Sequence, residues 1–207
     1  MRKFSWILFL LVAVPSFSFA QQGDTNGPVV ITKVEANLVP TPNYTVSAAT
    51  STPVTPSPKW LQVNFDFTAR NEKPFIDTLQ FRVYVEVAEP SGPDDQEGSP
   101  ALLVGETTFI NVPNERDLHG SFFIHPYTIR RFGGENAFSN FKAKRNIRVE
   151  ALIDGQQISF HDEHDDDANW VSSLRKISGM VLPRDQSPWA LVNIDRYPPV
   201  KTRSASQ

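Results

Sequence analysis

The residues best suited to chemistry lie in one acidic, histidine-containing run at positions 161–167. Histidine nitrogens and carboxylate oxygens are common ligands of zinc and calcium, so the candidate metal ligands are His161, His164, Asp165 and Asp167. Their order fits neither an EF-hand loop nor the zinc-protease motif, in which two histidines are four residues apart. We favour the alternative of a solvated acidic loop before a helix, because negative charge stabilises a helix N-terminus.

No other part of the sequence carries a catalytic signature. His119 and His125 flank a short apolar stretch, but there is no Gly-x-Ser-x-Gly motif to pair with them, and the chain has no cysteine. Paired carboxylates for sugar hydrolysis are defined by their separation in space, which the sequence does not provide. We therefore expect a non-enzymatic protein without a cofactor, and keep a metal-binding or hydrolytic secreted protein as an alternative.

Three aromatic residues are candidate contacts for a partner or ligand: Tyr84, Trp189 and Tyr197. Flat aromatic rings can stack on sugars, so a carbohydrate-binding β-sandwich module is a further alternative, with a glycan as ligand. Tyr84 belongs to the polar face of its expected strand, and we expect it to be exposed. Trp60 and Trp170 are expected to pack between elements instead.

The first twenty residues predict a cleaved export signal. Arg2 and Lys3 precede an apolar run at 6–14, and the small residues Ser18 and Ala20 stand before the expected cut. The absence of cysteine excludes disulfides and a lipid-modified signal, so we expect the bacterial periplasm or cell surface. No later segment has the length and apolarity of a transmembrane helix.

The charge of the mature chain argues against nucleic acid as a partner. Removal of Arg2 and Lys3 from 20 basic residues leaves 18 against 23 acidic residues, a net charge of −5. Such a chain lacks the basic field that phosphate backbones require. The remaining length suits a single domain with a core large enough to fold without disulfides.

Alternation of apolar and polar residues predicts about seven strands. They cover residues 29–39, 59–69, 79–87, 102–112, 121–124, 147–153 and 157–161. In the first strand we expect Val30, Thr32 and Val34 on one face. Asp154 and Gly155 predict a two-residue hairpin turn between the last two strands.

The segments between and after these strands differ in character. Residues 126–144 predict a broken helix or loop, and residues 169–178 a short amphipathic helix that ends at Gly179. The apolar content of residues 180–200 indicates that this last segment docks on its own domain or on a neighbouring one. The expected fold is an all-β, immunoglobulin-like antiparallel β-sandwich with one short C-terminal helix and an extended tail. The expected units are a signal peptide (1–20), a polar lead (21–28), the sandwich (29–179) with a Pro/Thr/Ser-rich loop (40–58), and the tail (180–207).

Residues 187–198 read Ser-Pro-Trp-Ala-Leu-Val-Asn-Ile-Asp-Arg-Tyr-Pro and follow the hairpin at 148–155 and the Trp170 helix. In this layout, the last third of the chain resembles exported immunoglobulin-like proteins encoded beside type IV pilus genes in Verrucomicrobia and related bacteria. The resemblance implies a non-catalytic envelope protein that is associated with pilus or secretion machinery and forms homo-oligomers. We therefore expect a structural or interaction protein, with a protein partner in the envelope or self-association.

Overall fold

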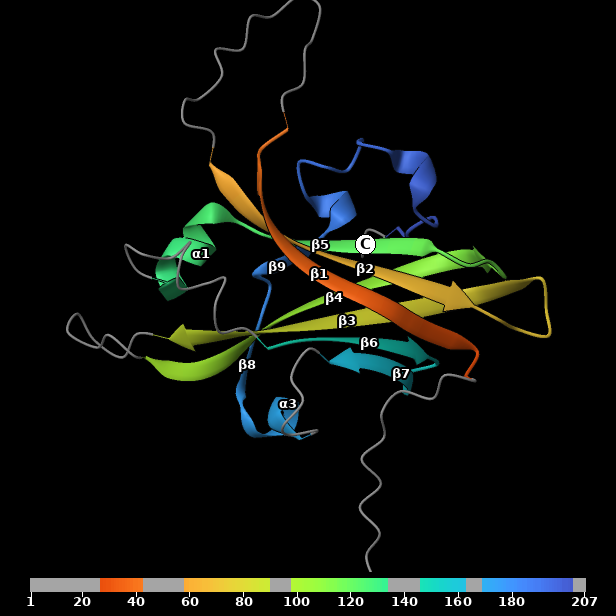
Figure 1. Ribbon diagram of the computed structural model, residues 1–207, viewed down its shortest axis with the longest axis horizontal. Coiled ribbons are helices and arrows are strands. Elements are labelled where there is room, and N and C mark those ends of the chain that lie inside the picture. The colour runs from red at the N-terminus through yellow and green to blue at the C-terminus, as the bar shows by residue number, and fades with distance from the viewer. Residues whose placement is uncertain (1–26, 43–57, 90–97, 134–145, 163–168, 203–207) are drawn as a thin grey trace, which may run out of the picture.

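The computed structural model describes residues 27–42, 58–89, 98–133, 146–162 and 169–202, which form two β-sheets packed face to face (Figure 1). The first sheet has the order β1-β2-β5-β9 and the second the order β7-β6-β3-β4-β8. The first contains β1 (Val29–Pro40), β2 (Lys59–Ala69), β5 (Leu118–Ile124) and β9 (Val181–Pro183). The second contains β3 (Phe75–Glu89), β4 (Ser99–Pro113), β6 (Ile147–Ile153), β7 (Gln156–Asp162) and β8 (Arg175–Ser178). The expected all-β sandwich is confirmed.

Phenylalanine rings from both sheets form the centre of the core. Phe65 and Phe67 of β2 each lie 4.7 Å, centroid to centroid, from Phe81 of β3, and all three are at most 1% exposed. Burying one such side chain stabilises the fold by roughly 1.5–3 kcal/mol. Gly120 of β5 makes room for this packing, because a Cβ at that position would lie 2.0 Å from Cζ of Phe65.

The expected inward face of β1 is wrong at its start. The register with β2 shifts just after Ile31, and such a bulge reverses the alternation of side chains. Val29 and Ile31 are buried before the shift and Val34 after it, whereas Thr32 is exposed and Val30 is half-buried. The apolar residues on both sides of the bulge therefore reach the same core.

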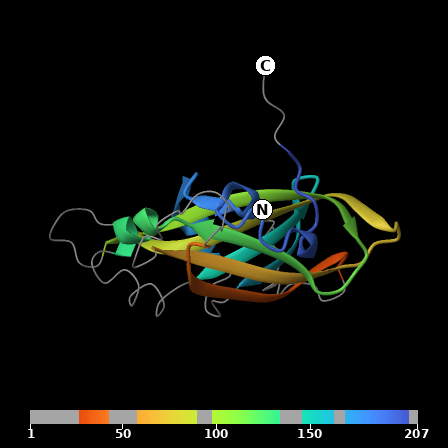
Figure 2. The ribbon, with the colours of Figure 1, turned by 90° about the horizontal axis from the view of Figure 1, so that it is seen from above.

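Two helical segments flank the sandwich. In the expected irregular region, α1 (Pro126–Gly133) buries Ile129 and Phe132 and lies at one end of the molecule (Figure 2). The rest of that region lies outside the described residues. The helix expected over 169–178 is wrong beyond its first turn, because α3 (Trp170–Ser173) ends at Leu174, which is extended. The next four residues form β8, parallel to β4, since pairing with a strand edge outweighs the weak helical preference of so short a segment.

The chain then crosses from the second sheet to the first. Gly179 has a φ of 85°, a conformation that glycine adopts readily, and it lies between β8 and β9. Residues 184–201, which we call the C-terminal segment, contain the 3₁₀ helices η1 (Arg184–Gln186) and η2 (Ile194–Arg196). The segment lies beside β5 and returns to β4, where the Ile110 amide donates to the Pro199 carbonyl at 2.9 Å (Figure 1). It thus docks on its own domain.

None of the helices in the described ranges is long and apolar enough to cross a bilayer.

Candidate functional site

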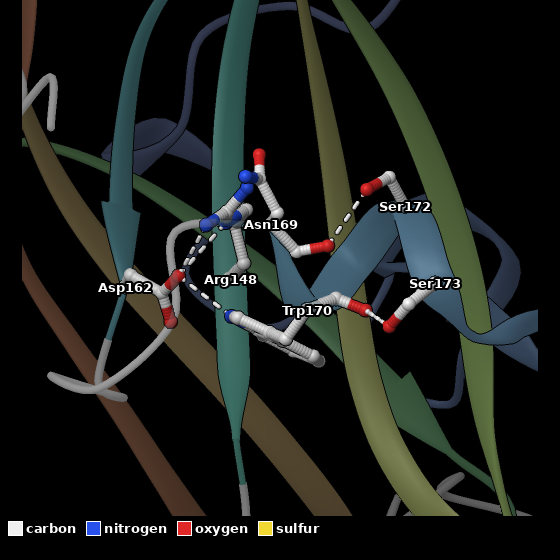
Figure 3. Close-up of polar contacts among 6 residues, drawn as sticks. All are labelled: Arg148, Asp162, Asn169, Trp170, Ser172 and Ser173. Atoms are coloured by element: carbon white, nitrogen blue, oxygen red, sulfur yellow. Dashed lines mark hydrogen bonds and ion pairs between the residues drawn. The ribbon is translucent and has the colours of Figure 1, made fainter. Parts of the chain in front are cut away.

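The acidic run is only partly described by the structure. His161 lies on β7, while His164, Asp165 and Asp167 lie outside the described residues, so the metal site stays a prediction. Among described residues, no three His, Cys, Asp or Glu side chains are grouped to hold a metal. At the end of β7, the Asp162 carboxylate accepts hydrogen bonds from Arg148 Nε at 2.9 Å and from Trp170 Nε1 at 2.8 Å (Figure 3). Asp162 therefore ties α3 to the second sheet.

α3 covers the part of the outer face of the second sheet around Tyr84, and this overturns the expected exposure of that residue. Tyr84 is only 3% exposed and packs in a small cluster with Trp170, Val171 and residues of β4. Trp170 and Trp60 are buried, so their expected packing role is confirmed. Around Tyr84 the polar side of β3 thus forms a second, smaller core, whereas Thr78 is exposed and Arg82 is half-buried.

A network of hydrogen bonds and an ion pair joins the polar groups on and beside Tyr84. The Tyr84 hydroxyl donates to Glu150 Oε2 at 3.2 Å, and Arg82 Nε forms an ion pair with Glu106 at 2.6 Å. Burial raises the pKa of the Glu150 carboxyl and that of the Tyr84 hydroxyl, because the charged form of each loses hydration. Tyr84 and Glu150 are buried and bond to each other, so we assign this network a structural role.

The other two aromatic candidates lie together on the outer face of the first sheet. Trp189 stacks on Phe123 of β5 with ring centroids 4.4 Å apart and an interplanar angle of 10°, and its edge meets Trp60. Tyr197 is half-buried, with the Arg184 guanidinium carbon 4.1 Å from its ring centroid. Stacking on Phe123 and the cation–π contact with Arg184 hold the C-terminal segment on the sheet.

A polar groove of about 320 Å³ lies between this segment and the sheet. Its floor comes from neighbouring strands, since Lys33 of β1, Asp66 of β2 and His119 of β5 stand side by side in register. The residues that line it are Lys33, Glu35, Gln62, Asn64, Phe65, Asp66, His119, Gly120, Asn193, Arg196 and Tyr197.

A chain of polar contacts joins the floor of the groove to its C-terminal wall. His119 Nδ1 lies 2.6 Å from Asp66 Oδ1, and Arg196 Nη2 lies 3.3 Å from His119 Nε2. Because a guanidinium has only donors, a hydrogen bond from Arg196 requires Nε2 to accept, and Nδ1–H then donates to Asp66. His119 thereby links the sheet to the C-terminal segment.

Sequence reasoning did not find this groove. Asp66 and His119 are 53 positions apart, and Arg196 is 77 positions from His119. The sequence did single out two of its lining residues, Tyr197 as a ligand contact and His119 as a lone histidine, but nothing in it joined them to Asp66. His125, the other histidine considered, packs its ring against Trp60 at 4.6 Å outside the groove.

Comparisons with known proteins give a family and a fold. A protein-family model matches residues 20–204 of the chain. No curated protein matches it. A crystal structure of a protein from Akkermansia muciniphila is similar, with a TM-score of 0.67 and 17% identity, over 87% of this chain and 97% of that one. At this identity the match shows a shared fold.

Proposed function

Since the chain belongs to the family whose model spans residues 20–204, we propose that it is a non-catalytic exported structural or interaction protein of the bacterial envelope, associated with pilus or secretion machinery. The match over nearly the whole chain is the observation that carries this proposal. Its first residue is Ala20, next to the expected signal cleavage. The fold shared with a protein from Akkermansia, a member of the Verrucomicrobia, supports the resemblance seen in the last third of the sequence.

The strand order supports the immunoglobulin-like part of the proposal. Constant-type immunoglobulin sheets have the orders A-B-E-D and C-F-G. Here β1-β2-β5 corresponds to A-B-E, and β3-β6-β7 corresponds to C-F-G. Strand β9 takes the place beside β5 that strand D has in those domains, so a late segment of the chain completes the first sheet.

Two surface features suit a protein partner. Leu191 and Ile194 of the C-terminal segment are 76% and 56% exposed, although Trp189 and Tyr197 near them are docked. Exposed apolar side chains on an ordered segment suit the apolar centre of a protein interface. In addition, β1 is the edge strand of the first sheet among the described elements, and such an edge can accept a strand from another chain.

Site-specific crosslinking in the bacterium that encodes the protein tests this function. A photoreactive residue replaces Leu191 or Ile194 in the full chain, and Gln157, exposed on β7 of the other sheet, is the control position. We expect crosslinks from 191 and 194 to an identified pilus or secretion component, or to a second copy of the chain, and none from 157. Absence of both products at the two test positions, or retention of the protein in the cytoplasm, would contradict the proposal.

A further inference from the structure

The groove under the C-terminal segment is balanced in charge. Lys33 Nζ lies 2.7 Å from Glu35 Oε1, and Asp66 Oδ1 lies 2.6 Å from His119 Nδ1. The Asp66 carboxylate and the Arg196 guanidinium offset each other through His119. A strongly charged ligand would have to displace these contacts, so the groove suits a neutral molecule.

Hydrogen-bonding capacity remains in the groove after these pairs are formed. The side-chain amides of Gln62, Asn64 and Asn193 form no hydrogen bond with any other residue in the described part of the chain. Each amide offers two donor hydrogens and an acceptor oxygen. Gln62 and Asn64 are successive outward positions on β2, about 7 Å apart along the strand. Asn193 belongs to the opposite wall, in a left-handed conformation with φ 52°.

The centre of the groove floor, strand β2, cannot bind a peptide by strand addition. The backbone of β2 pairs with β1 on one side and with β5 on the other, so a ligand meets only the side chains of this strand. Recognition by neighbouring amides that both donate and accept suits vicinal hydroxyl groups, which also donate and accept. The volume of about 320 Å³ is at the small end of ligand pockets, at roughly 300–1,000 Å³, and matches one or two sugar rings.

We propose that this groove binds a neutral mono- or disaccharide unit, with Gln62 and Asn64 as the contacts on the sheet and Asn193 and Tyr197 as the contacts on the C-terminal segment. The Tyr197 ring supplies an apolar surface for the sugar beside the amides. Of the three aromatic contacts expected from the sequence, Tyr197 lines this groove, whereas Tyr84 is buried and Trp189 is stacked on Phe123. The saccharide would bridge the sheet and the C-terminal segment.

Saturation-transfer NMR on the mature chain tests the proposal. The probes are galactose, N-acetylglucosamine, lactose, cellobiose and maltose. Each is used at a concentration of about 10 mM, which is about ten times an expected Kd of about 1 mM. We expect at least one probe to bind, and Asn64→Ala to weaken that binding about tenfold, as expected for the loss of one or two hydrogen bonds. Asn37→Ala is the matched control, because Asn37 is exposed on the same sheet face, beside Gln62 in register but outside the groove.

A second pair of variants keeps the test independent of folding defects. Gln62→Ala is expected to weaken binding like Asn64→Ala, whereas Gln157→Ala on β7 leaves binding unchanged. The bound probe should also slow amide hydrogen exchange in residues 190–197, because a ligand stabilises the state that binds it. No binding of any probe, or binding unaffected by both groove variants, would overturn the proposal while leaving the envelope function untouched.

Discussion

Substitution of Gly120 by alanine is expected to destabilise the sandwich, because the new methyl group has no room beside Phe65. The added Cβ would lie 2.0 Å from Cζ of Phe65 and 2.5 Å from both Cε atoms. Ordinary carbon–carbon contacts are about 3.5–4.0 Å, so the ring must move by about 1.5 Å. Phe81, with its centroid 4.7 Å away, and Phe122, at 6.0 Å, restrict that movement.

The magnitude follows from this overlap. Overpacking of a tight core lowers the free energy of unfolding by about 1–3 kcal/mol and occasionally more. The overlap here is with a ring whose movement is restricted, so we expect a value at the upper end of that range. We expect Gly120→Ala to lower the free energy of unfolding by about 3 kcal/mol. For a domain of this size that corresponds to a decrease in Tm of roughly 6–12 °C.

Urea unfolding followed by tryptophan fluorescence measures this loss. A double-mutant cycle with Phe65→Leu separates the clash from other effects, because the smaller side chain leaves space for the new methyl group. The pair is expected to be less destabilised than the sum of its members by about 1–3 kcal/mol. The control is Ser121→Ala on the same strand. Since the buried Ser121 Oγ has no partner among described residues, its loss should leave stability unchanged or raise it. A Gly120→Ala loss under about 1 kcal/mol, or additive effects in the cycle, would refute the reasoning.

Three further predictions concern the two segments that pack on the outer faces of the sheets, α3 and the C-terminal segment. Burial raises the pKa of Glu150 above its ordinary 4.5, so the folded protein binds the proton more tightly than the unfolded chain. This residue's contribution therefore makes the free energy of unfolding fall as pH rises from the unfolded-state pKa to the folded-state pKa. Glu150→Gln should remove that slope from urea unfolding measured at a series of pH values above 4.5, whereas an unchanged slope would exclude this cause. Trp170→Ala should lower the free energy of unfolding by about 3–5 kcal/mol, because it removes a buried side chain. It should also expose Tyr84 to collisional quenching of its fluorescence. A variant with a quenched Tyr84 and wild-type stability would contradict a packing role for Trp170. Trp189→Ala should speed proteolysis within residues 184–201, because it removes the stack on Phe123, and cleavage at the wild-type rate would show that this stack does not hold the segment.

Much of the layered architecture could be predicted from the sequence. The alternation in β2 placed Leu61, Val63, Phe65 and Phe67 inside, and all four are buried. The hairpin turn is also as expected, with φ of 51° at Asp154 and 77° at Gly155. These features are local, since the backbone of a strand directs successive side chains to opposite faces, and a two-residue turn depends on which residues accept a positive φ.

Which outer faces are covered was decided only by the tertiary structure. Tyr84 has the sequence position of an exposed residue, but α3, which follows it by more than eighty residues, covers it. The open edge of β4 turned an expected helix into β8, and the extra residue after Ile31 reversed the start of β1. The groove likewise depends on Asp66, His119 and Arg196 meeting across three distant segments. The periodicity of the sequence shows which side chains share a face of a strand. Whether that face is buried or open to solvent depends on contacts with residues far away in the chain.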